Sequence, residues 1–209
     1  MFTGLIQEKG KVKKIQRLAH TIRMTCEASE TLLSNYKIGD SMAVNGTCLT
    51  AIEKSKTLFT VDIMPETFKR TTFVNIKIGG EVNLELAMSY DKRFEGHLVS
   101  GHIDTTTRLV KKEKYENALL LTFLYPHKLL GEIIPQGSIA IDGISLTVTS
   151  TTSRTFSVSV IPHSQSITTI QNINVGQFVN IETDLIGKYI KAQSKLFDYP
   201  KLKGGLLYE

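Results

Sequence analysis

The sequence predicts an all-β protein of two similar domains, each a small closed barrel or sandwich, followed by one helix. The first observation is that the chain matches itself without a gap when shifted by 97 positions, with 12 identities in 28 aligned positions over windows beginning at residues 41, 64 and 78. Unrelated chains of ordinary composition share roughly one position in fifteen, so this repeat indicates a duplication. The second observation is a series of short strand patterns, spaced 8 to 12 residues apart between Gly and Asn turns. Such spacing is typical of barrels and sandwiches.

The repeat organises the chain into domains, because solenoid units span only about 20 to 50 residues. The expected boundaries are 1–93 for the first domain, 94–185 for the second, 186–198 for a helix and 199–209 for a tail. Alternating patterns predict strands in the first copy at 11–16, 21–27, 41–45, 48–54, 57–63 and 81–86. The second copy is expected to contain strands at 117–125, 138–142, 145–151, 155–160 and 178–182. Short helical segments are expected at 28–35, 65–71 and 126–131.

The strongest local signal is a pair of hairpins, SMAVNGTCLT at 41–50 and SIAIDGISLT at 138–147. Asn-Gly and Asp-Gly favour a two-residue type I′ turn, which needs positive φ at both positions. Because directly paired residues share a face, each hairpin has one bulky apolar face and one face of small side chains. The small faces are expected to carry Ser41, Ala43, Cys48 and Thr50 in the first copy and Ser138, Ala140, Ser145 and Thr147 in the second. Reuse of this face in both copies favours two related shallow ligand sites over a merely hydrated sheet surface.

A helix is expected after the second domain. Residues 186–197 place Ile186, Tyr189, Ile190 and Phe197 near one helical face. An amphipathic helix that follows two finished domains needs a surface to cover, either on its own chain or on another subunit, and the second alternative is favoured.

Composition excludes several classes of function. The chain of 209 residues is 41% hydrophobic and 22% charged, as in ordinary globular proteins, and has no run of 18 apolar residues that would predict a membrane span. The net charge of +5 is spread along the chain, whereas a nucleic-acid site would cluster basic residues on one face. The start of the chain lacks a signal-peptide pattern, and the two cysteines, Cys26 and Cys48, then suggest a reducing cytoplasm.

Seven motifs, in a fixed order, carry a resemblance to a known family. They are MFTGLI (1–6), SMAVNGTCLT (41–50), MPETFKRTT (64–72), GHLVSGHIDTT (96–106), IAIDGISLTV (139–148), IPHS (161–164) and the two VN-E strands (82–85 and 179–182). Together the motifs resemble riboflavin synthases of the homotrimeric, duplicated-barrel type, over roughly residues 1–190. The resemblance implies two six-stranded Greek-key barrels, each binding one molecule of 6,7-dimethyl-8-ribityllumazine, and a C-terminal helix that assembles a homotrimer. Lumazine synthase is a further candidate partner.

The resemblance implies a dismutation, in which one lumazine gives a four-carbon unit to another to form riboflavin and 5-amino-6-ribitylamino-uracil. No metal or redox cofactor is expected, because donor and acceptor are the same compound. The implied catalytic groups are Ser41 and Cys48 near the attacking group, and His102 in proton transfer, which suits an imidazole pKa near 6.5. Thr147 is expected to orient His102. Cys48 corresponds to Ser145, and His102 to Leu5, so the two sites are expected to play unequal parts.

Further ligand-facing positions are carried over by motif. In the first barrel they are Gly4, Leu5, Ile6, Cys48, Leu49, Thr50, Asp62, Ile63, Met64, Pro65, Glu66 and Thr67. In the second barrel they are Gly101, His102, Ile103, Gln136, Ser145, Leu146, Thr147, Ile161, Pro162, His163 and Ser164. Glu66 and Thr67 are expected to bind the ribityl chain. Gln136 stands where the family often has a lysine, so a charge is lost there.

Several alternatives remain at this point. A catalytically silent lumazine or flavin carrier could share the fold, and Cys48 and His102 could be structural. A flavin reductase would need a nucleotide-binding motif of the G-x-G-x-x-G type in a strand-to-helix context, which the sequence lacks. His97 and His102 lie five positions apart, on opposite faces of a regular strand, so a zinc pair is not expected. Cys26 is expected to be a buried apolar residue.

Overall fold

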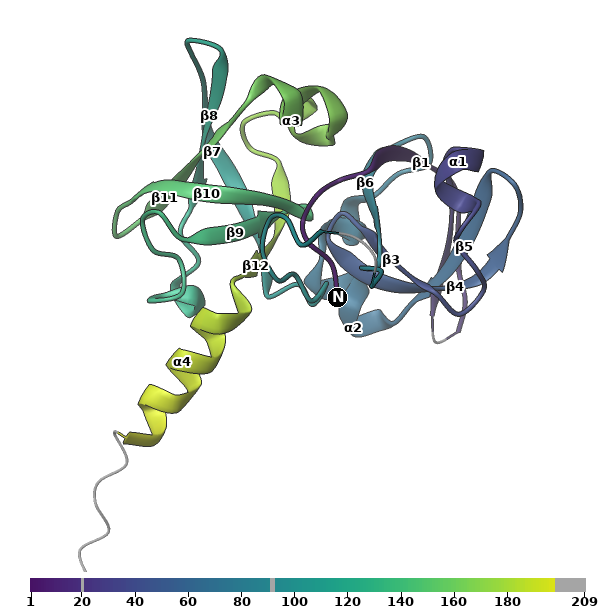
Figure 1. The fold of residues 1–209 in the computed structure, drawn as a ribbon, viewed down its shortest axis with the longest axis horizontal. Helices are drawn as coiled ribbons and strands as arrows, with labels where there is room; N and C mark the ends of the chain where they lie inside the picture. The colour runs from purple at the N-terminus through teal and green to yellow at the C-terminus, as the bar shows by residue number, and fades with distance from the viewer. Residues whose placement is uncertain (20, 91–92, 198–209) are drawn as a thin grey trace, which may run out of the picture.

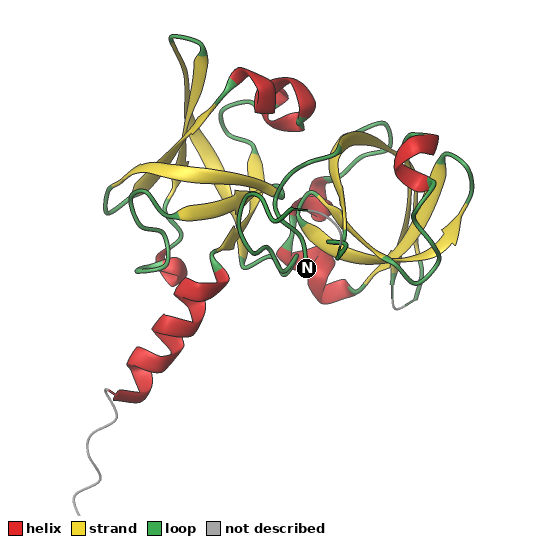
Figure 2. Cartoon of the chain, in the orientation of Figure 1, coloured by secondary structure: helices red, strands yellow, loops and turns green. Residues whose placement is uncertain are grey.

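The computed structural model describes residues 1–19, 21–90 and 93–197, the last four of them by their backbone only. The two halves form two barrels side by side, with a helix projecting from the second (Figure 1). Strands account for most of the regular structure (Figure 2). The predicted tail at 199–209, residue 198 and the side chain of Phe197 lie outside the described part. None of the helices within it has the length and hydropathy that a membrane crossing requires.

Each barrel closes from six antiparallel strands in the same order, which confirms the predicted fold. The first barrel consists of β1 (Glu8–Arg17), β2 (Ile22–Glu27), β3 (Ser41–Val44), β4 (Thr47–Lys54), β5 (Leu58–Ile63) and β6 (Glu81–Leu86). The second consists of β7 (Thr105–Tyr115), β8 (Ala118–Leu124), β9 (Ser138–Ile141), β10 (Ile144–Thr151), β11 (Thr155–Val160) and β12 (Phe178–Thr183). The cyclic order is β1-β2-β5-β4-β3-β6, repeated as β7-β8-β11-β10-β9-β12. Because each barrel closes on itself, neither leaves a sheet edge unpaired.

The helices are short except for the last. They are α1 (Glu30–Leu33), α2 (Pro65–Arg70), α3 (Pro162–Ile167) and α4 (Leu185–Phe197), with 3-10 turns η1 (Thr72–Asn75), η2 (His127–Leu129) and η3 (Thr169–Asn172). The helical segment expected at 126–131 is only the three-residue turn η2. Strand β7 and helix α3 were not predicted. The charged residues at the end of β7 conceal its alternation, although its first half buries Thr107 and Leu109.

The duplication extends to the irregularities of the strands. The register shifts after Val12 in β1 and after Leu109 in β7, and again after Ala51 in β4 and Val148 in β10. Each pair of positions is separated by the repeat length of 97. A bulge bends its strand and increases the local twist, which a small barrel needs in order to close.

Each barrel has its own apolar core. Phe59 and Met24 are fully buried in the first, and Phe123 stacks on Phe156 in the second with ring centres 5.5 Å apart. Cys26 is fully buried in the first core, as expected, and its burial raises the pKa of the thiol to about 12. The thiol therefore remains protonated and packs as a small apolar group.

The barrels meet at the tips of their two hairpins. Asn45 and Gly46, like Asp142 and Gly143, have the positive φ values predicted for a type I′ turn. The two glycines lie back to back, because a Cβ added to Gly46 would stand 2.6 Å from the backbone nitrogen of Gly143. No side chain fits between the two turns, so the contact requires glycine on both sides.

Two buried asparagines fasten this contact. The Asn83 side chain on β6 donates to the carbonyl of Asp142 and accepts from the N–H of Thr169, both in the second barrel. Asn180 on β12 makes the two equivalent bonds to the first barrel. Both asparagines are fully buried, so all four bonds replace water that folding removes. The docking is therefore specific and nearly two-fold symmetric.

We predict that Asp142→Asn stabilises the protein in a pH-dependent way. Burial raises the pKa of Asp142 to about 7, against the one opposing bond from the N–H of Asn180. The folded chain therefore holds a proton that the unfolded chain releases, so stability falls as pH rises from about 4 to about 7. The variant removes this loss. Its advantage in free energy of unfolding should be small near pH 4 and on the order of 4 kcal/mol near pH 8, because about three pKa units separate the folded from the unfolded carboxyl; urea denaturation measures it.

The matched control is Asn45→Asp, because Asn45 holds the equivalent position and its side chain accepts from the N–H of Asn83. This variant should lose stability as pH rises. A difference between Asp142→Asn and the wild type that does not change with pH would contradict the prediction.

Candidate functional site

The two hairpins have the predicted register. Ser41 pairs with Thr50 and Ala43 with Cys48, and β9 pairs with β10 in the same way. The bulky faces point into the barrels: Met42 and Leu49 are buried in the first core. The small faces are therefore turned out of the barrels, as expected.

What covers the small faces differs from the expectation. Cys48 donates its backbone N–H to the carbonyl of Gly101 at 2.8 Å, and Ser145 donates to the carbonyl of Gly4 at 2.7 Å. The segment that leads into each barrel thus lies on the hairpin of the other barrel. The expectation grouped Gly4, Leu5 and Ile6 with the first hairpin and residues 101–103 with the second, whereas the structure places each segment on the opposite hairpin. A repeat identifies equivalent residues, but it does not say which copy's hairpin a segment crosses.

At both crossings the glycine segment lies very close to the hairpin strand. A Cβ added to Gly101 would stand 2.5 Å from the Cβ of Cys48, and one added to Gly4 would stand 2.6 Å from the Cβ of Ser145. Ile6 continues the pattern, since its side chain belongs to the core of the second barrel. Between the crossings, Phe2 is fully buried against small residues of both hairpins. The site face is thus built from both barrels of one chain.

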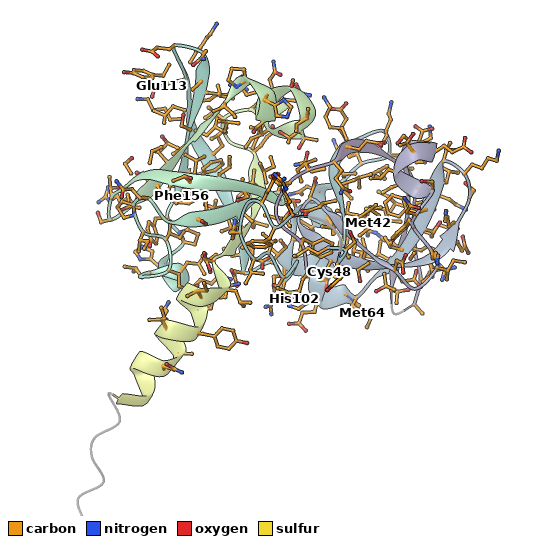
Figure 3. The ribbon with its side chains drawn as sticks, in the orientation of Figure 1. Met42, Cys48, Met64, His102, Glu113 and Phe156 are labelled. Carbon is orange, nitrogen blue, oxygen red and sulfur yellow. The ribbon has the colours of Figure 1, made fainter. Side chains whose placement is uncertain are left out.

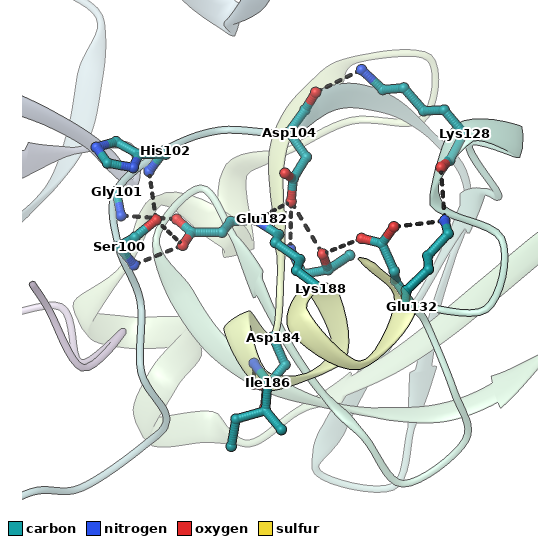
Figure 4. Close-up of polar contacts among 12 residues, drawn as sticks. Ser100, Gly101, His102, Asp104, Lys128, Glu132, Glu182, Asp184, Ile186 and Lys188 are labelled. Carbon is teal, nitrogen blue, oxygen red and sulfur yellow. Dashed lines mark hydrogen bonds and ion pairs between the residues drawn. The ribbon is translucent and has the colours of Figure 1, made fainter. Parts of the chain in front are cut away.

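A buried carboxylate holds each crossing segment to its own barrel. Glu182 on β12 accepts from the N–H and hydroxyl of Ser100 at 2.7 and 2.6 Å and from the N–H of Gly101 at 2.9 Å (Figure 4). Glu85 on β6 holds Thr3 and Gly4 in the same way. Burial raises the pKa of Glu85, while the bonds from Thr3 and Gly4 partly offset it. These carboxylates orient the glycine carbonyls toward the opposite hairpins.

His102 follows directly from this arrangement. Its backbone N–H donates to the Ser100 hydroxyl at 3.2 Å, and its side chain is exposed. Since Gly101 touches Cys48, His102 lies beside the hairpin of the first barrel. Figure 3 shows Cys48, His102 and Met64 on the same side of the molecule. The structure therefore brings together two of the predicted catalytic residues. It places Thr147 on the other hairpin.

The remaining predicted ligand positions divide by exposure. Exposed are Leu5, Thr50, Met64, Pro65, Glu66, His102, Gln136, Thr147, Ile161, Pro162 and His163. Half-buried are Ser41, Cys48, Asp62, Thr67, Ser145 and Ser164. The side chains of Leu49, Ile63 and Leu146 point into the barrel cores, and Ile103 is also buried. Because side chains alternate along a strand, those three core residues can offer a ligand only backbone groups, which corrects the expectation for their side chains.

Two of the acidic candidates are held by arginines. Asp62 receives two hydrogen bonds from Arg23, at 2.8 and 2.9 Å, and this contact lowers the pKa of its carboxyl. Glu66 pairs with Arg70 one turn later in α2, at 2.6 Å. Asp62 therefore stays ionised at neutral pH, whereas the Glu66–Arg70 pair is exposed.

His97 and His102 lie in different surroundings. His97 and His102 lie in a loop rather than in the regular strand assumed from the sequence, and His97 is buried whereas His102 is exposed. Within the described ranges, no group of three or more His, Cys, Asp or Glu side chains lies close enough to hold a metal ion. Two hollows of about 900 and 350 Å³ mark the described surface, and Cys48 and His102 line neither. The exposed side chains of Thr50, His102 and Thr147 show that both hairpin sites are open to solvent in a single chain.

Sequence reasoning missed four buried polar side chains that support the site. These are Asn83 and Asn180, which join the barrels, and Glu85 and Glu182, which hold the crossing segments. The VN-E motifs contain all four, and the alternation of each strand puts the Asn and Glu on the face opposite the apolar core residues. Reuse of the same Asn and Glu in both copies was the signal, because a polar side chain that is buried needs a partner.

Comparisons with known proteins agree on the kind of domain. The family model described as lumazine binding domain matches the chain twice, at residues 3–87 and 100–184. A riboflavin synthase of Bacillus subtilis is 42% identical over 190 residues, covering 91% of this chain and 88% of the relative. A riboflavin synthase of Actinobacillus pleuropneumoniae is 43% identical over 203 residues, covering 96% and 94%.

Solved structures show the same fold. The crystal structure of LumP with riboflavin superposes with a TM-score of 0.80 at 27% identity, and covers 88% of this chain and 99% of that one. The structure of LumP with 6,7-dimethyl-8-(1'-D-ribityl) lumazine gives 0.79 at 26% identity, with the same coverage.

We predict that Gly101→Ala separates the crossing segment from the first hairpin. Gly101 has φ +83, and a Cβ there would collide with Cys48, so the variant adds a clash to the strain of positive φ. Gly39→Ala is the matched control, because Gly39 has φ +92 with nothing within 4 Å. The control should lose about 1 kcal/mol of unfolding free energy and Gly101→Ala roughly 3 kcal/mol or more, measured by urea denaturation. Equal losses in the two variants would show that the close crossing does not exist.

Proposed function

This chain belongs to the riboflavin synthase family, and we propose that it converts two molecules of 6,7-dimethyl-8-ribityllumazine into riboflavin and 5-amino-6-ribitylamino-uracil. The reaction is a transfer of a four-carbon unit between two identical molecules, so the enzyme is a transferase. The observation that carries the proposal is the pair of equivalent hairpin sites, each crossed by a glycine segment of the other half. Two like substrates need two like sites.

The sites are alike in backbone but unlike in reactive side chains. Cys48 and His102 stand at the first hairpin, whereas Ser145 and Leu5 take the equivalent positions at the second. Unequal side chains allow one bound lumazine to donate and the other to accept. Holding the two rings in register supplies much of the acceleration, because it turns a bimolecular reaction into one within the complex.

We assign Ser41, Cys48 and His102 to the first-barrel site. Ser41 and Cys48 bind or activate the attacking group, and the exposed His102 transfers protons. Because Thr147 lies on the other hairpin, we assign it to the second-barrel site rather than to the orientation of His102. We also assign to the two sites Met64, Thr67, Ile161 and Ser164, which lie at or near the starts of α2 and α3.

The two rings can meet only if a first-barrel site faces a second-barrel site. Within one chain the barrels dock through their hairpin tips and crossing segments, which leaves the two open sites on separate barrels. We therefore propose that the sites pair between subunits of a homotrimer. Helix α4 supports this assembly, since Ile186, Tyr189 and Ile190 are 60%, 67% and 64% exposed in the single chain.

Mixing of 6,7-dimethyl-8-ribityllumazine with the purified chain tests the activity. We expect riboflavin to form, followed by its absorbance, without added metal or redox cofactor. The rival is a carrier such as the likeness to LumP suggests, which would bind the lumazine and leave it unchanged. Tight binding without riboflavin formation would establish the carrier and reject the synthase.

Mixed trimers test the pairing between subunits. Cys48→Ala and Thr147→Ala chains, each expected to lose most activity alone, should recover up to about a quarter of the wild-type rate when unfolded and refolded together, because random assembly restores some intact pairs. Cys48→Ala mixed with His102→Ala is the matched control. Both changes fall in the first-barrel site, so this mixture should recover nothing. Failure of the first mixture to exceed its parents would rule out sites shared between chains.

A further inference from the structure

His97 is a buried histidine that the proposed chemistry does not use. Its side chain is 7% exposed in the segment before the second crossing, and its Nδ1 lies 2.7 Å from the hydroxyl oxygen of Ser145. Its backbone N–H donates to the carbonyl of Thr3 at 3.1 Å. Gly96, just before it, has φ +76 and comes so near Thr3 that an added Cβ would stand 2.2 Å from that carbonyl oxygen. The ring is thus held firmly against Ser145.

The position of the ring proton follows from burial. Burial lowers the pKa of His97, and the nearby charge of Asp184 only partly opposes it, so the ring is neutral at pH 7 and carries one N–H. Nε2 is buried and has no hydrogen-bond partner in the described part of the chain. Buried N–H groups without an acceptor are rarer than unpaired acceptors. The proton therefore belongs on Nδ1, which donates to Ser145.

The hydrogen bond from His97 leaves the Ser145 hydroxyl able to donate to a ligand. With one lone pair taken by His97, the hydroxyl keeps its own proton free, and His97 is the one side chain hydrogen-bonded to it among the described residues. Ser145 lies half-buried on the small face of the second hairpin, opposite Ala140. Its hydroxyl is therefore an oriented donor at the second site.

The first site differs at this position. Cys48 takes the place of Ser145, so the first hairpin offers a thiol where the second offers a hydroxyl. We propose that His97 is a positioning residue for the reaction, which turns the Ser145 hydroxyl proton toward a carbonyl oxygen or ring nitrogen of the lumazine bound at the second barrel. The inference rests on the proposed function and makes the second barrel the site where negative charge on a ring is stabilised.

Kinetics of the full-length protein test the role. Because an unoriented hydroxyl stabilises charge poorly, His97→Leu should lower kcat by about ten- to a hundredfold with a smaller change in KM. His97→Asn should restore most of the rate, since its amide N–H can replace Nδ1–H. In a Ser145→Ala background, His97→Leu should have no further effect. His127→Leu, a change at an exposed histidine in η2, is the control and should leave kcat unchanged.

The same variants separate this role from a structural one. If His97 served only to dock the barrels, His97→Leu would cost as much activity in the Ser145→Ala chain as in the wild type, and the proposal would fall. Should His97→Leu not fold, ¹⁵N NMR of histidine-labelled wild-type protein still decides. Protonated Nδ1 and bare Nε2 are expected, assigned with His97→Asn, and the opposite tautomer would overturn the proposal. A wild-type protein that makes no riboflavin would instead reject the proposed function.

Discussion

The close approach of two backbone segments is the constraint on which the rest of the molecule depends. Each hairpin donates an N–H to a glycine carbonyl from the other half, at 2.7 and 2.8 Å, and no Cβ fits at either crossing. Behind each crossing, Glu85 or Glu182 holds the segment by its N–H groups and hydroxyl. These contacts fix where each crossing segment lies, and they require a glycine with positive φ at the crossing point. The candidate sites inherit their geometry from these contacts.

Much of this could be predicted because the signals are local. Asn-Gly and Asp-Gly determine the turn type, the turn determines the register, and the register determines which side chains share a face. The faces of both hairpins were therefore predicted correctly, down to Cys48 opposite Ala43. The repeat then gave two barrels, because each copy carries a complete set of strands and its own buried aromatic residues.

The sequence could not predict that each crossing segment lies on the hairpin of the other barrel, because a repeat does not show which copy a segment contacts. The repeat shows that Gly4 and Gly101 are equivalent, and this holds whether each lies on its own hairpin or on the other. The long-range contacts of Gly101 with Cys48 and of Gly4 with Ser145 distinguish the two arrangements, and the repeat carries no information about them. His97 was assigned no role from the sequence for a similar reason. Its partner Ser145 is 48 positions away, so spacing along a strand carried no information about it.

Helix α4 and the second crossing segment are both held by residues at the end of β12. Lys188 pairs with Asp104 at 2.7 Å (Figure 4). Lys191 pairs with Glu132, also at 2.7 Å, so the basic face of the helix is bound to its own barrel. Thr183 donates its backbone N–H to Asp104 and its hydroxyl to Glu132, and the residue before it, Glu182, holds Ser100 and Gly101. Because these polar contacts anchor one face of α4, its apolar face is left outward. The direction of the helix and the position of His102 are therefore set by the same few residues at the end of β12.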